Sequence, residues 1–404
     1  MGSRAIVLQS ALPWARNCHD FPERAAVEGC ATMASLMTIL FSAGGSIGHI
    51  APCIAVWRQL EKLAPGSAVH FACSTMQDDV SFLQEERVPF TPLTARRVTA
   101  LMFPVAFVKA WILLSSVKPD VILSKGGGVT VPIAIAAWMK RIPIVVHESD
   151  SVPGRATRLI SKFAKVVCYG FADENEKLKM NSEKSLVAVN SNFSFFIIHS
   201  VYSGNPLRTE IISGSRDQGL AITGFNGQKP ILLVTGGSQG AQTFNEVVAS
   251  KLEALLPLVD VIHLTGRGKN AAVPDGGGYW SRPFVHEELP HLYAISTLAL
   301  ARAGAGSISE LAANGIPAIL VPLEGVAHDH QLKNAEAAVL SGGCLLLRQA
   351  SLAKNLLSTV QSIAGNTDLR TSMSGKIRSL HKPDADVAVA KILLAYLGED
   401  CPMP

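Results

Sequence analysis

The sequence predicts an α/β protein of two Rossmann-like domains, whose parallel sheets face each other across a cleft. Residues 38–49 and 231–241 carry the same pattern, in which a buried strand leads into a glycine-rich turn and a helix start. Each stretch opens its own alternation of short apolar segments with helical patterns, which is typical of parallel sheets. The apolar content of 48% and the charged content of 17% agree with sheets that are covered on both faces.

The predicted elements follow in chain order. In the first half we expect strands over 38–43, 68–73, 121–123, 144–147 and 166–169, and helices over 51–63, 77–87, 98–116, 131–141 and 155–163. In the second half we expect strands over 231–234, 259–264, 298–301 and 318–321, with helices between them and a last helix over 384–397. The chain then divides into a loosely ordered extension (1–36), a first domain (37–205), a linker (206–229), a second domain (230–380) and a C-terminal segment that returns to the first domain (381–404).

Composition and charge exclude several classes of protein. A formal net charge of +4 is too small to indicate nucleic-acid binding, although it permits contact with an anionic membrane surface. The seven cysteines are scattered without a CxxC pair, which argues against a disulfide framework or a zinc site and fits a reduced compartment such as the cytoplasm. No apolar run reaches the roughly 18 residues of a membrane span, since Pro104 and Lys109 interrupt the longest one. We expect no metal site, and we interpret Asp384 and Asp386 as part of a helix cap.

The two glycine-rich turns predict places for anions. Glycine permits positive φ and a close approach to a ligand, and the helix that follows presents unpaired N–H groups. We expect Ser238, Gln239 and Gly240 to cradle the pyrophosphate of a nucleotide-linked substrate, the alternative being an ordinary tight turn. Glu310 lies near the start of a later helix, where a carboxylate can accept both hydroxyls of a ribose or complement the helix dipole.

His49 follows the first glycine-rich turn at a helix start. An imidazole in that place can act as the general base for an acceptor hydroxyl, contact a phosphate or serve as a polar cap. The residues alone leave these roles open.

Six motifs, in the right order, resemble those of the MurG family of bacterial cell-wall glycosyltransferases. They are Gly44-Gly45-Ser46-Ile47-Gly48-His49, Val146-His147-Glu148-Ser149-Asp150, Gly204-Asn205-Pro206-Leu207-Arg208, Gly236-Gly237-Ser238-Gln239-Gly240-Ala241, the segment 302–311 (RAGAGSISEL) and the segment 329–335 (DHQLKNA). The resemblance extends from about residue 37 to residue 397.

The resemblance implies a GT-B fold and an inverting hexosyltransferase. The family transfers N-acetylglucosamine from UDP-N-acetylglucosamine (UDP-GlcNAc) to lipid I, which is undecaprenyl-pyrophosphoryl-MurNAc-pentapeptide, and so makes lipid II for peptidoglycan synthesis. No cofactor is expected. The resemblance also implies roles in cell wall biogenesis, cell shape and cell division, and a peripheral place on the cytoplasmic face of the inner membrane.

The resemblance further assigns site residues. It implies that Glu310 binds the ribose, that the backbone of Val285 faces the uracil, and that Arg208 binds the uridine or phosphate side of the donor. The alternatives are an ordinary apolar strand end for Val285 and a salt bridge in the linker for Arg208. Further implied contacts come from Ser46, Ile47 and Gly48 toward the acceptor, from the backbone of Ala305, Gly306 and Ser307 toward the donor, and from Gln331 and Asn334 toward the GlcNAc hydroxyls, unless these last two lie in a solvated first turn.

Three positions depart from the family pattern. Ile47 stands where the family has glycine, so its side chain is expected to intrude where the backbone should approach the acceptor pyrophosphate. Asp150 stands where the family has asparagine, and an ionised Asp can only accept hydrogen bonds. Asp150 could accept from GlcNAc hydroxyls, assist as a catalytic base, or cap the helix that begins at Arg155. Gly306 replaces a larger residue and offers no side-chain contact.

The stretch from Thr94 to Arg141 is basic, with seven Lys or Arg residues and one acid. Phe103, Phe107 and Trp111 recur within it at helical spacing, which is typical of a core-facing stripe. The alternative is an apolar patch with a basic rim that docks on an anionic phospholipid surface, which an enzyme with a lipid acceptor needs.

Two other functions are open on the same scaffold. A UDP-sugar epimerase would keep the sites at Glu310 and Ser238 but would give no purpose to the His49 turn. A non-catalytic nucleotide-sugar binder is suggested by the departures at Ile47 and Asp150.

Overall fold

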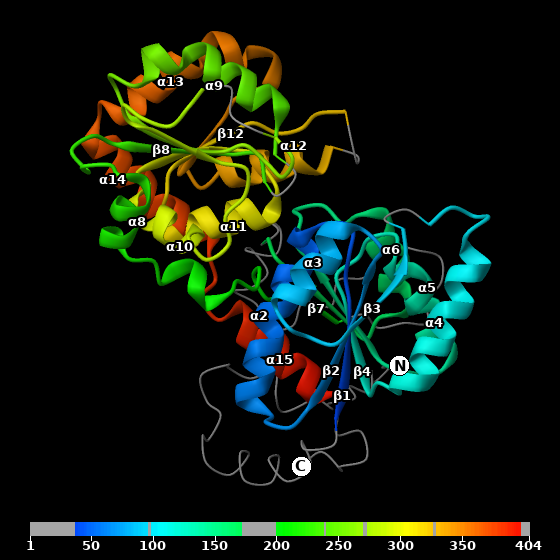
Figure 1. Cartoon of the computed structure of the whole chain (residues 1–404). Helices are drawn as coiled ribbons and strands as arrows, with labels where there is room; N and C mark the ends of the chain where they lie inside the picture. The colour runs from blue at the N-terminus through cyan, green and yellow to red at the C-terminus, as the bar shows by residue number, and fades with distance from the viewer. Residues whose placement is uncertain are drawn as a thin grey trace, which may run out of the picture.

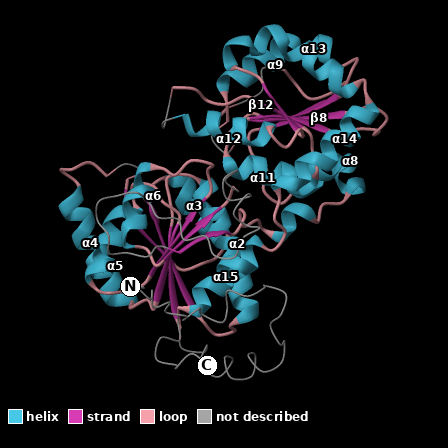
Figure 2. Ribbon diagram, turned by 180° about the vertical axis from the view of Figure 1, so that it is seen from behind, coloured by secondary structure: helices cyan, strands magenta, loops and turns pink. Residues whose placement is uncertain are grey.

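The computed structural model describes residues 37–95, 98–171, 199–237, 240–269, 273–325 and 329–396. The predictions for the extension 1–36, for Ser238 and Gln239, and for the end of the C-terminal segment (397–404) lie outside these residues, as do Arg96 and Arg97 of the basic stretch. Figure 1 shows two domains, one built from the blue and cyan elements of the first half and one from the green to orange elements of the second half. Each contains a parallel sheet flanked by helices (Figure 2), which confirms the predicted α/β class and the pair of Rossmann-like domains.

The first domain is a seven-stranded parallel sheet within the described residues, in the order β3-β2-β1-β4-β5-β6-β7. Its strands are β1 (Thr38–Ser42), β2 (Ala68–Ser74), β3 (Phe90–Thr94), β4 (Val121–Ser124), β5 (Ile144–Glu148), β6 (Val166–Tyr169) and β7 (His199–Tyr202). Its helices are α2 (Ile47–Leu63), α3 (Gln77–Glu85), α4 (Phe103–Val117), α5 (Thr130–Met139) and α6 (Arg155–Ile160). Alternate residues of β1 enter the two apolar clusters on opposite faces of the sheet, Ile39 and Phe41 on one face and Leu40 on the other.

The second domain repeats this plan with six strands among the described residues, in the order β10-β9-β8-β11-β12-β13. The strands are β8 (Ile231–Thr235), β9 (Asp260–Leu264), β10 (Tyr279–Arg282), β11 (Leu298–Ala301), β12 (Ala318–Leu320) and β13 (Cys344–Leu346). The helices are α9 (Gln242–Leu255), α10 (Leu289–Ile295), α11 (Ala305–Asn314), α12 (His330–Val339), α13 (Leu352–Ala364) and α14 (Thr367–Ile377).

The strand order reverses at one point in each sheet. In the first sheet β1 lies between β2 and β4, and in the second β8 lies between β9 and β11. The loops that leave the two central strands at such a switch point run to opposite faces, and they open a crevice at the carboxyl ends of the strands, where ligands bind in this class of fold. The first glycine-rich turn follows β1 and the second follows β8, so both lie at switch points.

The chain crosses between the domains twice. The first crossing carries a 3-10 helix, η4 (Thr209–Ile212), and α8 (Arg216–Thr223). The predicted linker 206–229 is therefore partly helical, and α8 packs against α10 of the second domain, since a Cβ at Gly219 would come within 2.3 Å of a backbone oxygen of α10. The second crossing leads into α15 (Ala385–Ala395), whose Val389, Ala390 and Leu393 are buried in the first-domain core beside α2 (Figure 1).

Candidate active site

A cavity of about 580 Å³ lies between the two domains. The first domain lines it with the turns after β1, β4 and β5, and the second domain with the turn after β8, the segment after β10 and the starts of α11 and α12. The two switch points therefore open into one shared space. The lining includes the following predicted site residues: Ser46, Ile47, Gly48, His49, Asp150, Arg208, Val285, Ala305, Gly306, Ser307, Glu310 and Gln331.

The imidazole of His49 is oriented by the backbone of the first glycine-rich turn. Its Nδ1 lies 2.9 Å from the carbonyl oxygen of Gly44. Because a carbonyl oxygen can only accept, Nδ1 carries a proton and Nε2 of the neutral ring keeps its lone pair. Gly127, in the turn after β4, has a φ of 89°, and a Cβ there would lie 3.1 Å from the Gly44 oxygen and 3.6 Å from His49 Nδ1. Two glycine turns thus enclose His49 and leave Nε2 as a proton acceptor.

Asp79, which no sequence motif indicates, holds the same turn in place. Its carboxylate is fully buried in the first turn of α3 and accepts hydrogen bonds from the backbone N–H of Gly45, at 2.6 Å, and from the hydroxyl of Ser74, at 2.5 Å. A buried carboxylate in this place fixes the turn that holds His49.

Ile47 lies at the edge of the cavity as the first residue of α2. Its side chain is partly buried and packs against the apolar cluster beneath α2, so only part of it faces the cavity. Ser46 caps the start of α2 in extended conformation, and Gly48 is exposed beside it.

Lys125 lines the cavity, although it was predicted to lie in the basic stretch that could meet a membrane. The residue is only 4% exposed, and it lies directly after β4. Nζ of Lys125 donates to Nδ1 of His147, at 2.5 Å, and to the hydroxyl of Ser149. Burial lowers the pKa of Lys125 to about 8, so the group is mostly a buried cation at neutral pH. A lysine directly after a buried strand at a switch point is the signal that could have found it.

The loop after β5 is held by Glu148. One carboxylate oxygen of Glu148 accepts from the N–H of Asp150 and the other from the N–H of Gly154, both at 3.1 Å. Gly154 is the N-cap of α6, so Glu148 and not Asp150 serves this helix start, and the capping alternative for Asp150 is wrong.

Asp150 contacts the second domain directly. One oxygen of its carboxylate accepts from Nδ2 of Asn334, at 2.8 Å, and the other lies 3.3 Å from Nδ1 of His330. Burial raises the pKa of Asp150, but the hydrogen bonds from His330 and Asn334 outweigh it and hold that pKa below its ordinary value. The hydrogen bond to Asp150 raises the pKa of His330 in turn. The aspartate that stands here in place of the family's asparagine thus sets a carboxylate beside an imidazole across the cleft, and the two form an ion pair when His330 is protonated.

The predicted place of Asn334 against the sugar needs correction. Asn334 is fully buried and is absent from the cavity lining. Its amide donates to Asp150 and to the carbonyl of Ala303, and its oxygen accepts from the N–H of Ser151, at 2.8 Å. Gln331 does line the cavity, and its side-chain oxygen accepts from the N–H of Leu323. Asn334 therefore joins the domains and Gln331 faces the shared space.

We expect the Asp150–His330 pair to make thermal stability depend on pH. Because the pKa of His330 is raised in the folded protein, protonated His330 stabilises the fold. This contribution to the free energy of unfolding is complete below the ordinary pKa of 6.5, and it is lost as the pH rises through the pKa of the folded protein. In the Asp150→Asn variant His330 loses the anion that raises its pKa, so the fall in melting temperature as the pH rises above about 6.5 should flatten. Melting curves of both proteins across this range test the pair, and parallel curves would exclude it.

On the second-domain side, Glu310 lies in α11 with Tyr293 behind it. The hydroxyl of Tyr293 donates to Oε2 of Glu310, at 2.7 Å, so the carboxylate is oriented while it lines the cavity. Burial raises the pKa of Glu310, against the lowering effects of Tyr293 and Arg208. Ala305, Gly306 and Ser307 form the first turn of α11, where free N–H groups point toward the cavity end of the helix. A Cβ at Gly306 would meet no atom within 4 Å, so the missing side chain leaves this part of the cavity open.

The second glycine-rich turn is described at Gly236, Gly237 and Gly240. Gly240 has a φ of 64°, and a Cβ there would lie 2.2 Å from the carbonyl oxygen of Thr265, so only glycine fits. Gly237 lines the cavity, while Gly240 packs against the loop after β9 and lies behind the lining.

Arg208 and Val285 lie at the same end of the cavity. Val285 is buried in the segment that follows β10. Arg208 lines the cavity. It also forms a salt bridge, which was the alternative predicted for it, with Nη1 3.2 Å from Oε1 of Glu86. The same Nη1 lies 3.0 Å from Nε2 of His286. One guanidinium thus meets both the cavity and an ion-pair network.

Comparisons with known proteins place both halves in one enzyme family. Residues 39–169 match the glycosyltransferase family 28 N-terminal domain, and residues 231–388 match the glycosyltransferase family 28 C-terminal domain. The chain is 32% identical over 369 residues to the UDP-N-acetylglucosamine–N-acetylmuramyl-(pentapeptide) pyrophosphoryl-undecaprenol N-acetylglucosamine transferase of Legionella pneumophila (strain Paris), with 88% of this chain and 96% of that protein covered.

Solved structures share the fold. MurG of Acinetobacter baumannii superposes with a TM-score of 0.66 at 23% identity, covering 89% of this chain and 99% of that one. The UDP-GlcNAc 2-epimerase of Neisseria meningitidis superposes with a TM-score of 0.64 at 16% identity, covering 89% of this chain and 100% of that one. The fold therefore serves both transferases and epimerases, and the sequence relationship separates the two.

Proposed function

The chain belongs to the family of UDP-N-acetylglucosamine–N-acetylmuramyl-(pentapeptide) pyrophosphoryl-undecaprenol N-acetylglucosamine transferases, and from this premise we propose how its cavity works. It is a glycosyltransferase that transfers GlcNAc from UDP-GlcNAc to lipid I and makes lipid II. The observation that supports our assignment of the site is that one cavity is lined by His49 of the first domain and by Glu310 of the second.

In the proposed reaction His49 is the general base. Its Nε2 takes the proton of the acceptor hydroxyl, whose oxygen attacks the anomeric carbon of GlcNAc from the face opposite to UDP. The bond between that carbon and the phosphate oxygen breaks as the new bond forms, so an α-linked donor gives a β-linked product and UDP leaves with the electron pair. The Gly44 carbonyl fixes the ring so that Nε2 is the atom free to accept.

The second domain holds the donor in this proposal. Glu310, oriented by Tyr293, accepts hydrogen bonds from the ribose hydroxyls, and Val285 packs beside the uracil. The N–H groups at the start of α11, together with Gly237, face the pyrophosphate and stabilise the negative charge that develops as UDP leaves. Ser238 and Gln239 keep their predicted part in this cradle. Gln331 meets the GlcNAc hydroxyls.

Asp150 is the weaker candidate for the base. Its carboxylate is engaged by Asn334 and His330, and these contacts hold its pKa low, so it accepts a proton poorly. We assign it the role of joining the domains beside the sugar site.

An assay with UDP-GlcNAc and a short-chain lipid I analogue tests this function against its competitors. We expect the analogue to gain one GlcNAc and UDP to appear only when the acceptor is present. Conversion of UDP-GlcNAc to another UDP-sugar without acceptor would identify an epimerase. Binding of UDP-GlcNAc with no turnover would identify a non-catalytic binder.

The lipid acceptor requires the first domain to meet the membrane, and α4 offers the surface. No helix in the described residues combines the length and apolar character needed to cross a bilayer. Phe107 packs against the core as the helical stripe predicted, but Trp111 of the same stripe is 36% exposed, and the opposite side of α4 exposes Val105, Val108 and Ile112. Trp138 and Met139 of the neighbouring α5 are also exposed. Lys109, Lys140 and Arg141 flank this apolar surface, and Nζ of Lys140 lies 4.1 Å from the ring centre of Trp111.

We expect this surface to bind the cytoplasmic leaflet of the inner membrane. Electrostatic attraction to anionic lipid contributes about 1 kcal/mol per basic residue near the surface. Replacing the exposed Lys109 and Arg141 with Gln should therefore reduce binding to anionic vesicles, and added salt should weaken the wild type in the same way. Turnover on a water-soluble acceptor should survive, because the cavity is elsewhere.

The matched control replaces two exposed lysines of the second domain, Lys354 and Lys376, with Gln. Sedimentation with vesicles that contain about one-third anionic lipid measures all three proteins. Equal losses in both double variants would mean that overall charge, and not the α4 surface, governs vesicle binding.

A further inference from the structure

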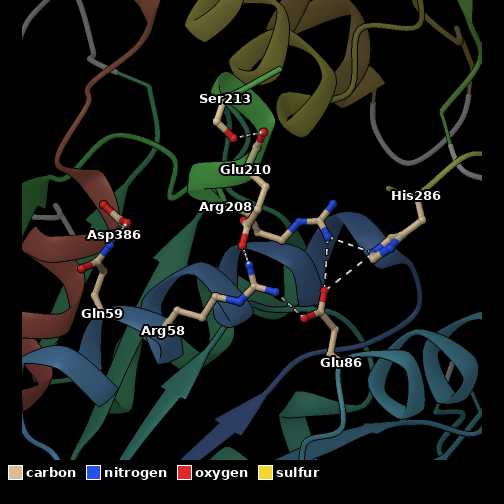
Figure 3. Close-up of polar contacts among 8 residues, drawn as sticks. All are labelled: Arg58, Gln59, Glu86, Arg208, Glu210, Ser213, His286 and Asp386. Atoms are coloured by element: carbon tan, nitrogen blue, oxygen red, sulfur yellow. Dashed lines mark hydrogen bonds and ion pairs between the residues drawn. The ribbon is translucent and has the colours of Figure 1, made fainter. Parts of the chain in front are cut away.

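A buried carboxylate gathers three basic side chains at one end of the cavity. Glu86 is the C-cap residue of α3, and its side chain is 4% exposed. Its Oε2 accepts from Nη2 of Arg58, at 2.8 Å, and its Oε1 lies 3.2 Å from Nη1 of Arg208 and 3.7 Å from Nε2 of His286. Figure 3 shows the three side chains converging on Glu86. Removing one partner from such a shielded cluster leaves a buried charge without its counter-charge, which costs far more than breaking an exposed ion pair.

The three partners come from three different parts of the molecule. Arg58 belongs to α2 of the first domain, Arg208 to the first crossing between the domains, and His286 to the second domain, one residue after Val285. Phe82, one turn earlier in α3, adds apolar contacts to two of them. Its ring meets the His286 ring edge-on at 5.9 Å and lies 5.6 Å from the guanidinium carbon of Arg208. Helix α3 thus reaches across the cleft to the segment proposed to hold the uracil.

The positive charges of Arg58 and Arg208 explain why position 86 carries a carboxylate. Arg208 is only 12% exposed and Arg58 is 29% exposed, so the two guanidinium groups approach one another in a shielded place. Burial raises the pKa of Glu86, but its contacts with His286 and the two arginines hold that pKa below the ordinary value, so Glu86 is ionised at neutral pH. Nη1 of Arg208 lies 3.0 Å from Nε2 of His286 and 3.2 Å from Oε1 of Glu86, so one guanidinium nitrogen contacts both the imidazole and the carboxylate.

The same helix that carries His49 anchors both crossings. Arg58 pairs with Glu86 and also with Glu210 of η4, on the first crossing. The next residue, Gln59, donates to Oδ2 of Asp386 in α15, at 2.8 Å, on the second crossing. Figure 3 shows both contacts on α2. The network therefore links the orientation of the second domain to the helix that positions the base.

We propose that Glu86 is a positioning residue for donor binding, which holds Arg208 and the Val285–His286 segment in the arrangement that receives the nucleotide. This inference rests on the proposed donor role of Arg208. Without the carboxylate, the shared Nη1 of Arg208 loses its anion, and His286 keeps only its ring contact with Phe82 in the first domain. The nucleotide would then have to order the Arg208 side chain and the Val285–His286 segment as it binds, and the entropy lost in ordering them lowers its affinity.

The first test is donor affinity in Glu86→Gln, which keeps the size of the side chain and removes its charge. We expect the Kd of UDP-GlcNAc to rise about tenfold, the size of coupling typical of contacting groups. The KM of a water-soluble acceptor should not change, and kcat at saturating donor should stay near wild type. Glu85→Gln, at an exposed neighbouring position of α3, is the matched control and should change none of these. Circular dichroism melting checks that each variant is folded, and Glu86→Asp, which restores the charge, should recover part of the lost affinity.

A double-mutant cycle separates this inference from the function it rests on. Arg208→Ala should weaken donor binding, and adding Glu86→Gln to it should weaken binding little further, because Glu86 acts through Arg208. Effects that multiply in the double variant would overturn the inference. A normal donor Kd in Glu86→Gln with a raised Kd in Arg208→Ala would overturn it while leaving the donor role of Arg208 intact. A normal Kd in Arg208→Ala would remove that donor role itself.

Discussion

Replacing His49 with alanine should lower turnover by about 10²–10⁴-fold, the usual contribution of a general base, while the affinity for UDP-GlcNAc changes little. The reason is geometric. The carbonyl of Gly44 accepts the hydrogen bond from Nδ1, so Nε2 keeps its lone pair, and His49 lines the cavity. The contacts proposed for the donor come from the second domain and from Arg208 on the first crossing, so its binding does not depend on the imidazole.

His49→Asn separates the base from a merely structural role. The asparagine amide can donate to the Gly44 carbonyl as Nδ1 does, but it has no basic nitrogen. We expect the asparagine variant to be as slow as the alanine variant, with donor binding intact by calorimetry. His70→Ala, in the same domain and outside the cavity lining, should keep full turnover. Weak donor binding with normal turnover at saturation would instead make His49 a phosphate contact.

Replacing Glu310 with alanine should weaken UDP-GlcNAc binding by roughly 1.5–3 kcal/mol, the range for hydrogen bonds to a charged group. The carboxylate lines the cavity, and the Tyr293 hydroxyl orients it through Oε2. Removing it leaves the ribose hydroxyls without acceptors and the Tyr293 hydroxyl without its partner. Calorimetry with UDP-GlcNAc and with UDP measures the loss.

A deoxyribose analogue identifies the contact itself. Wild-type protein should bind 2′-deoxy-UDP more weakly than UDP, because one hydroxyl no longer donates to Glu310. In Glu310→Ala the two nucleotides should bind alike. Tyr293→Phe keeps the carboxylate and should fall between the two proteins. A variant that still prefers UDP over its deoxy analogue would place the ribose elsewhere.

Much of the fold could be predicted because the central strands are buried on both faces. β1, β4, β8 and β11 read as short apolar runs, and each ends in a polar or glycine-rich turn. The strands that were not predicted are β3, β7, β10 and β13, and these are the outer strands of the two sheets. An outer strand has a neighbour on one side only, and β3, β7 and β10 contain polar residues or proline, such as Pro92 in β3, so their sequences lack the apolar run. The fourth outer strand, β13, is apolar but only three residues long.

The site divides in a similar way. Motif residues that follow central strands, such as His49 and Glu310, lie at the cavity because the carboxyl ends of parallel strands meet there. Residues that act through distant partners were missed or misplaced. Asn334 and Asp150 are 184 residues apart in the sequence, and Glu86 and Arg208 are 122 apart, so no local sequence pattern predicts either contact. Lys125 was counted as a surface charge. Its buried position is possible because His147 accepts a hydrogen bond from its ammonium group, and the sequence alone does not place His147 beside it.

The linkage formed on the acceptor tests the central claim most directly. Wild-type protein is incubated with UDP-GlcNAc labelled at the anomeric carbon and a short-chain lipid I analogue, and the product is examined by nuclear magnetic resonance. We predict a single new β-linked GlcNAc on the acceptor sugar, with one UDP released for each linkage. An α-linkage, or a labelled sugar altered without acceptor, would contradict direct displacement assisted by His49 in the cavity between the two domains.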